Sequence, residues 1–313
     1  MGYAPSPMTN SAHPAAPQSR QTLVLGVIGG SGLYQMDALS DASQVELSTP
    51  FGAPSAAYTV GTLPRKDAPP VKAVFLPRHG VGHRFLPSEI NYRANIHGLK
   101  QLGVTHLVCV SAVGSLREDV EPGHIVVPDQ LIDRTKGRES TFFGDGVVGH
   151  VQFGDPTCDR LRPLVAESAK EAGATVHEGG SCIVMEGPAF STRAESNLYR
   201  SWGASIIGMT ALPEAKLARE AEMAYTMLAL STDYDCWHTE EVSVEAVMAV
   251  MAGNIERARQ TLVALASKLP ETTAQLPYPR AVENALMTAP EHIGVDARRR
   301  LDLIIGHVLE TRD

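Results

Sequence analysis

The chain has 313 residues, a formal net charge of −8 and a hydrophobic fraction of 43%. The length fits one large α/β domain or two small ones, and the apolar fraction is enough to bury a sizeable core. The negative charge argues against nucleic acid or an anionic membrane as the main partner, and no run of about 18 apolar residues predicts a transmembrane helix.

Residues 1–20 are rich in Pro, Ala and Ser and lack the apolar centre of a signal peptide, so we expect a disordered leader. The four cysteines form no CxxC pair and have no zinc-ligand spacing; they are Cys109, Cys158, Cys182 and Cys236. Two of them, Cys109 and Cys182, lie inside apolar runs, where a reduced and buried thiol is expected. Reduced thiols suit a cytosolic protein, so we predict a cytoplasmic location.

Apolar runs and polar turns alternate along the first half of the chain. Short apolar runs bounded by glycine or proline predict buried strands at 23–28, 71–76, 106–111 and 123–127. Between the second and third of these, a helix is predicted from Ser88, as N-cap, to Gly103.

The same alternation continues in the second half. Helices are predicted at 157–171, 193–202 and 213–223, and strands at 181–186, 205–209 and 225–231. Apolar residues from Val247 to Leu265 recur at spacings of three and four, which predicts one long helix ended by Pro270. A charged helix is predicted at 295–309. We therefore expect an α/β fold with a largely parallel, buried sheet, a single domain at 21–269 and a C-terminal extension at 270–313.

Polar residues follow four of the predicted strands: Ser31, Arg78 with His79, Ser111, and Thr210. In open α/β sheets, ligands bind outside the carboxyl ends of the strands. The guanidinium of Arg78 matches phosphate geometry, and the glycines beside Ser31 let an oxyanion approach the backbone. Each of these residues alone could be structural, but together they predict an anion site.

Two other kinds of site are disfavoured by the same stretches. The glycine loop at 29–32 is followed by Leu33, Tyr34 and Gln35, so it lacks the third glycine of a dinucleotide fingerprint, and the Walker lysine is absent. His79 and His83 are four residues apart, but two glycines lie between them and no third ligand follows. We therefore expect no metal and no dinucleotide.

Two carboxylates, Asp233 and Asp235, stand at alternating positions just after the apolar run AYTMLAL. In an extended chain both side chains point to the same face. Paired acids beside a ligand raise one pKa and provide an acid or a hydrogen-bond acceptor. The alternative interpretation is an ordinary pair of aspartates that caps a loop.

From about Val24 to about Ser267 the chain resembles the S-methyl-5'-thioadenosine phosphorylases of the purine nucleoside phosphorylase family. The resemblance is carried, in order, by VIGGSGLY, LPRHGVGHRFLPSEINYRANI, SLREDVEPGHIVVPDQLIDRT, MEGPAFSTRAESNLYRSWGASIIGMTALPEAKLAREA and STDYDCW. It implies a single α/β domain with a mixed, mostly parallel and distorted sheet, usually in a homotrimer. It also implies a pentosyltransferase of purine and methionine salvage, which uses inorganic phosphate as co-substrate and needs no metal or organic cofactor.

The resemblance also implies roles for individual residues. Phosphate is expected at Ser31, Arg78, His79, Ser111, Ala112 and Thr210. The base is expected at Phe190, Ser191, Asp233 and Asp235, and the ribose beside Met209, with His83 near the sugar and phosphate. The 5' substituent is expected at Val244 and Met248, and His150 is expected to reach a neighbouring subunit's site.

The chemistry that this set predicts is phosphorolysis of S-methyl-5'-thioadenosine to adenine and 5-methylthioribose 1-phosphate. Asp233 is the candidate general acid at N7 of the purine, and Asp235 the candidate that raises its pKa. Carboxylates are acceptors and favour the 6-amino group of adenine over a 6-oxo group. The alternatives are a phosphorylase for 6-oxopurine nucleosides such as methylthioinosine, inosine and guanosine, a nucleosidase that uses water, and a nucleoside-binding protein without catalysis.

Overall fold

The structure is a computed structural model that describes residues 21–30, 32–33, 37–238, 244–276, 278 and 280–310, without the side chains of 244–247 and 249. The predicted leader at 1–20, Ser31 and the side chain of Val244 therefore lie outside the described residues. Within the described part, no helix is both long enough and apolar enough to cross a lipid bilayer.

Four long parallel strands form the centre of the sheet: β1 (Val24–Gly29), β4 (Ala68–Pro77), β5 (His106–Ser115) and β11 (Ala224–Tyr234). β1 lies between β4 and β5, and β11 pairs with β5 along most of its length. Their near-continuous apolar sequences are explained by burial on both faces. All four were predicted, although β4 and β5 extend beyond the predicted runs.

Seven further strands complete one mixed sheet of eleven strands in the described residues. The main order is β2-β3-β4-β1-β5-β10-β9-β7; β11 also pairs with β5, β6 pairs with β11, and β8 pairs with β6. The seven further strands are β2 (Ser40–Val45), β3 (Tyr58–Arg65), β6 (Ile125–Val127), β7 (Gln130–Arg134), β8 (Val176–Glu178), β9 (Ser181–Met185) and β10 (Ile206–Gly208). β3 is antiparallel to both of its neighbours, β2 and β4, and β10 is antiparallel to β5. The expectation of a mixed, mostly parallel sheet is confirmed.

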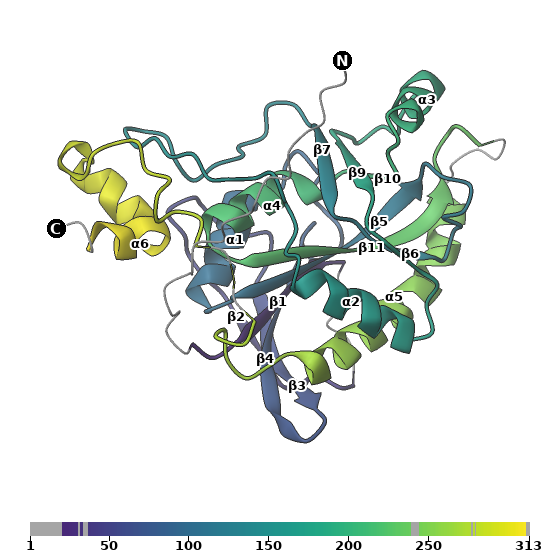
Figure 1. The fold of residues 1–313 in the computed structure, drawn as a ribbon, viewed down its shortest axis with the longest axis horizontal. Coiled ribbons are helices and arrows are strands. Elements are labelled where there is room, and N and C mark those ends of the chain that lie inside the picture. Colours follow the sequence, from purple (N-terminus) through teal and green to yellow (C-terminus); the bar gives the residue numbers. More distant parts are fainter. Residues whose placement is uncertain are drawn as a thin grey trace, which may run out of the picture.

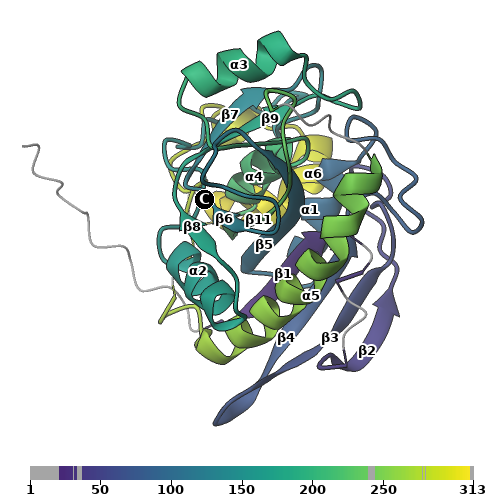
Figure 2. The same ribbon diagram turned by 90° about the vertical axis from the view of Figure 1, so that its right-hand side faces the viewer.

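Helices cover both faces of the sheet (Figure 1). α1 (Tyr92–Gln101), α4 (Ala211–Glu220) and α6 (Val295–Leu309) pack on one hydrophobic cluster. On the other face, α2 (Leu161–Glu171) and α5 (Val244–Lys268) pack on a second cluster and run side by side in both views (Figure 2). α3 (Arg193–Ser201) lies beyond the end of the sheet.

The starts of α1, α2 and α4 differ from the predictions, and α4 begins at Ala211, two residues before the predicted Pro213. α1 begins at Tyr92, not at Ser88, since the side chain of Asn91 accepts a hydrogen bond from the Ala94 amide and acts as the N-cap. Its end is as predicted, because Gly103 has a φ of +83° that other residues rarely adopt. α2 begins at Leu161, four residues later than predicted.

The C-terminal extension packs tightly on the rest of the chain. α6 buries Leu301, Ile304 and Ile305 in the same cluster as α1 and α4. Its predicted limits, 295–309, match the helix. The side chain of His307 also lies 3.2 Å from the buried carboxylate of Glu222. The extension therefore completes one hydrophobic core, since the cluster would otherwise be open to solvent.

Candidate functional site

A cavity of about 500 Å³ opens at the carboxyl ends of the central strands and is closed on one side by α5. Most of the residues predicted for a nucleoside and phosphate site line it: Arg78, His79, His83, Ser111, Ala112, Phe190, Met209, Thr210, Asp233, Asp235 and Met248. These residues come from six separate segments of the chain, and the sheet brings them together. Gly30 and Gly32, which flank Ser31, line the same cavity.

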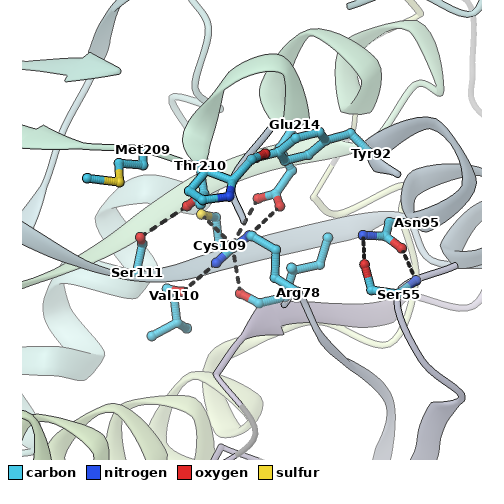
Figure 3. Close-up of polar contacts among 12 residues, drawn as sticks. Ser55, Arg78, Tyr92, Asn95, Cys109, Val110, Ser111, Met209, Thr210 and Glu214 are labelled. Atoms are coloured by element: carbon cyan, nitrogen blue, oxygen red, sulfur yellow. Dashed lines mark hydrogen bonds and ion pairs between the residues drawn. The ribbon is translucent and has the colours of Figure 1, made fainter. Parts of the chain in front are cut away.

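Hydroxyl groups mark one end of the cavity. The Ser111 and Thr210 hydroxyl oxygens are 3.2 Å apart and connect the middle of β5 to the residue just before α4 (Figure 3). Thr210 precedes α4, yet its side chain does not cap the helix and is available to a ligand. Two hydroxyls beside a glycine loop suit an anion, because each can donate one hydrogen bond to an oxyanion.

Arg78 is buried beneath this end, with 2% of its surface exposed, and forms an ion pair of 2.8 Å with the buried Glu214 (Figure 3). It also donates to the carbonyl oxygens of Ile28 and Val110 and to the sulfur of Cys109. Burial alone lowers the pKa of Arg78, but the charge and hydrogen bond of the Glu214 carboxylate, together with Cys109 and Tyr225, outweigh burial and hold that pKa above its ordinary value. Nη1 makes one hydrogen bond and has two hydrogens, so it can still donate to an anion.

His79 stands beside Arg78 and stacks on His83, with ring centroids 4.1 Å apart. Its Nδ1 donates a hydrogen bond of 2.8 Å to the carbonyl oxygen of Phe85. Burial, opposed by this hydrogen bond and assisted by the nearby charge of Arg78, lowers the pKa of His79 to about 4. The imidazole is therefore neutral at pH 7, with the proton on Nδ1, and Nε2 can accept a hydrogen bond from the hydroxyl of a bound phosphate.

Asp233 and Asp235 line the cavity further along the sheet, since β11 places Asp233 beside Gly114 of β5, three residues beyond Ser111. β11 is irregular between Ser231 and Asp233, and this bulge sets the direction of the carboxylates that follow. Burial raises the pKa of Asp233 to about 6; a 2.7 Å hydrogen bond from Thr232 opposes the shift, and the Asp235 charge adds to it. Burial also raises the pKa of Asp235, which is 3% exposed. Both acids line the cavity, as predicted.

The raised pKa of Asp233 predicts a pH-dependent effect on stability. Between pH 3.8 and about 6 the folded protein binds more protons at Asp233 than the unfolded chain does, so this residue's contribution to stability falls as the pH rises. Asp233→Asn should therefore raise the free energy of unfolding by about 1–2 kcal/mol at pH 7. Urea denaturation at several pH values measures this gain. A gain that persists unchanged below pH 3.8, where both states hold the proton, would contradict the account.

Apolar side chains close the remaining wall. Met248, Met251 and Ile255 of α5 face the cavity, together with Phe190. Met248 and Phe190 are 64% and 49% exposed, so solvent reaches the outer edge of this wall. The sequence analysis did not single out Met251 and Ile255 for the site, although their spacing from Met248 follows the same helical face that predicted α5.

Two predicted site residues do not line the cavity. His150 is exposed on a loop, where its backbone N–H donates to the carbonyl of Ala285 in the C-terminal extension. Ser191 lies behind the wall, with its hydroxyl 3.5 Å from the sulfur of Met185. The roles predicted for these two residues remain predictions.

Comparison with known proteins identifies the family of this chain. Residues 24–267 match the family model of the phosphorylase superfamily. An S-methyl-5'-thioadenosine phosphorylase from Geobacter sulfurreducens is 55% identical and covers 90% of this chain and 98% of the relative. One from Synechocystis sp. is 50% identical and covers 90% of this chain and 86% of the relative.

Solved structures give the same result. A methylthioadenosine phosphorylase from an antarctic soil metagenomic library superposes with a TM-score of 0.82 at 44% identity and covers 90% of this chain and 99% of that chain. A variant of the adenosine/methylthioadenosine phosphorylase of Schistosoma mansoni, in complex with methylthioadenosine, has a TM-score of 0.72 at 36% identity, and covers 79% of this chain and 91% of that chain. The chain therefore belongs to the phosphorylase superfamily, and within it to the S-methyl-5'-thioadenosine phosphorylases.

Proposed function

We propose that this protein cleaves S-methyl-5'-thioadenosine with inorganic phosphate, giving adenine and 5-methylthioribose 1-phosphate. The observation that carries the proposal is a single cavity lined both by anion-binding groups and by two carboxyl groups of raised pKa. A nucleoside placed between them would have its sugar over the phosphate and its base at the acids. The substrates named for the relatives and the solved structures support the same reaction.

The reaction needs stabilisation at two points. The N-glycosidic bond breaks through an oxocarbenium-like sugar, which a phosphate beneath C1' stabilises and then attacks. The departing purine becomes electron-rich and needs a proton or a hydrogen bond at N7. Asp233 has a pKa of about 6, so about a tenth of it is protonated at pH 7 and can supply this proton. The sugar passes from nitrogen to a phosphate oxygen, the proton of Asp233 passes to the base, and the proton that the phosphate loses as it forms the ester returns to Asp233.

The groups around the base and the 5' carbon support the choice of substrate. Carboxylates accept hydrogen bonds from the 6-amino group of adenine and repel a 6-oxo group. At the 5' end, the apolar wall at Met248 and Met251 favours a methylthio group over a hydroxyl by only about 1–3 kcal/mol, so adenosine is expected to be a slower substrate.

A panel of four nucleosides tests the proposed specificity: methylthioadenosine, adenosine, methylthioinosine and inosine, each with and without phosphate. The expected order of kcat/KM places methylthioadenosine first and both 6-oxopurine nucleosides last. If inosine and methylthioinosine were preferred, the alternative function as a 6-oxopurine phosphorylase would replace the proposal. Equal cleavage without phosphate would indicate a nucleosidase.

We further propose that the active form is a homotrimer in which His150 completes a neighbour's site. His150→Ala and Asp233→Asn should each lower activity when every subunit carries the change. In mixed trimers, however, a subunit with intact Asp233 can meet a neighbour with intact His150, so coexpression of the two variants should restore activity. Absence of any recovery, or a fully active monomer in sedimentation, would contradict this assembly.

We also propose a cytoplasmic location and a reaction that needs no cofactor. All four cysteines carry free thiols, which suits the reducing cytoplasm. The chemistry above uses phosphate as co-substrate and side chains as acid and hydrogen-bond donors, so we propose that no metal or organic cofactor takes part. Activity that survives prolonged treatment with a chelator is the expected result, and loss of activity that added metal restores would contradict it.

A further inference from the structure

Arg138 is a buried arginine that connects several walls of the cavity without lining it. It lies on the segment after β7, and 3% of its side chain is exposed. Nε donates to the carboxylate of Glu186 at 3.1 Å, and Nη2 donates to the carbonyl oxygens of Met185 and Glu186. Nη1 donates to the carbonyl oxygens of Met209 and Leu212, at 2.7 and 2.9 Å.

These contacts join two walls that come from distant parts of the sequence. Met185 lines the cavity at the end of β9, and Met209 lines it immediately before Thr210. No strand of the sheet continues through either turn, so the backbone carbonyls there need a donor from elsewhere. The Arg138 guanidinium donates hydrogen bonds to backbone carbonyls of both walls.

Arg138 is also connected to a third wall of the cavity, through Tyr92. Nη1 of Arg138 has two hydrogens for three acceptors, so it shares one of them with the hydroxyl oxygen of Tyr92 at 3.2 Å, and that hydroxyl donates to the carbonyl oxygen of Pro87 at 2.9 Å. Pro87 lines the cavity on the same loop as His83 and Phe85. The chain of hydrogen bonds therefore runs from the 83–87 loop through Tyr92 and Arg138.

Only a planar, multidentate donor can make these contacts together. The guanidinium has five N–H groups in a fixed fork, whereas a lysine ammonium has three donors on a compact point charge. Glu186 balances the charge of Arg138, so the ion pair contributes no net charge to the cavity.

We propose that Arg138 is a positioning residue for phosphorolysis, which fixes the walls at Met185, Met209 and Pro87 relative to one another. It touches none of the reacting groups and acts through the backbone of those walls. This inference rests on the proposed function, because its readout is the phosphorolysis rate. A displacement of about 1 Å in a catalytic site can cost about 10²-fold in rate, and the loss of several hydrogen bonds at these turns permits such a displacement.

The test compares Arg138→Lys and Arg138→Ala with a matched control, Glu139→Ala. Glu139 is the next residue, is exposed and pairs with Arg93 on α1, so its removal perturbs the same segment without touching the walls. For each folded variant, kcat and both KM values are measured well below the thermal unfolding midpoint. Arg138→Ala is also assayed with added guanidinium, and with ammonium as the control cation, at non-denaturing concentrations.

The expected result is a loss of about 10²-fold in kcat/KM for Arg138→Lys, recovery of Arg138→Ala by guanidinium but not by ammonium, and wild-type kinetics for Glu139→Ala. A purely structural role lowers the unfolding midpoint and leaves the kinetics of folded Arg138→Lys unchanged, and this outcome would overturn the proposal. If both Arg138 variants fail to fold, Tyr92→Phe removes one link alone, and wild-type kcat/KM in that variant overturns it. If the wild-type protein itself shows no phosphorolysis, the proposed function is refuted instead.

Discussion

Replacing Asp233 with asparagine is expected to lower kcat/KM for methylthioadenosine by about 10²-fold, the usual size of a general-acid contribution. The substitution keeps the shape of the side chain but exchanges an acceptor oxygen for an NH2 donor. Asparagine has no carboxyl proton for the departing base, whereas Asp233, with a pKa raised to about 6 by burial, has one. For 6-oxopurine nucleosides the new donor removes a repulsive contact, so their relative kcat/KM should rise.

The companion variant Asp235→Asn distinguishes this role from simple loop capping. Asp235 raises the pKa of Asp233 only as a secondary cause after burial, so its removal should cost less activity. If the two acids merely cap a loop, both variants lose stability together and the ratio of adenine to hypoxanthine substrates stays constant. Measurement of kcat/KM for both bases on folded variants separates these outcomes, and an unchanged ratio in Asp233→Asn would remove that residue from base recognition.

Arg78→Ala is expected to lower the free energy of unfolding by about 3–5 kcal/mol, since it leaves the carboxylate of Glu214 buried without its partner. The carbonyl oxygens of Ile28 and Val110 also lose a donor. The stability cost therefore obscures any loss of phosphate binding in this single variant. Urea denaturation of the ligand-free protein measures the cost, and an unfolding free energy equal to that of the parent would contradict the buried ion pair.

The double variant Arg78→Met with Glu214→Gln separates stability from phosphate binding. Replacing both partners of a buried ion pair with neutral groups of similar volume is often close to neutral, so most of the stability should return. If Nη1 of Arg78 donates to phosphate, the KM for phosphate of this stable variant should still rise by roughly tenfold or more, because a charge-assisted hydrogen bond is lost. A KM for phosphate equal to that of the wild-type protein would indicate that only hydroxyls and backbone N–H groups bind phosphate.

Local patterns in the sequence were enough to predict the central strands and the cavity at their carboxyl ends. Strands buried on both faces, such as β1 and β11, have continuous apolar runs, and polar residues directly after them mark the ligand edge. β2 could not be predicted in this way. Its sequence, SDASQV, is mainly polar and exposed, and it is held by pairing with β3.

Local sequence patterns also could not predict which residues pair with the buried charges. Arg78 and Glu214 are 136 positions apart in the chain, and either residue alone has the sequence appearance of a solvent-exposed charge. Arg138 and Met209 are separated by 71 positions, and Arg138 follows a strand, β7, that the sequence analysis did not predict. Such contacts depend on how the sheet brings distant turns together, which hydrophobic periodicity does not specify.

The group that attacks the sugar, phosphate or water, can be identified from the reaction products. Methylthioadenosine is incubated with the full chain and phosphate, and phosphorus NMR and adenine release are followed in the same sample. The account predicts a sugar 1-phosphate that appears in equal amount to adenine, and no adenine release when phosphate is omitted. Adenine released at the same rate in phosphate-free buffer, with free methylthioribose as the second product, would contradict it.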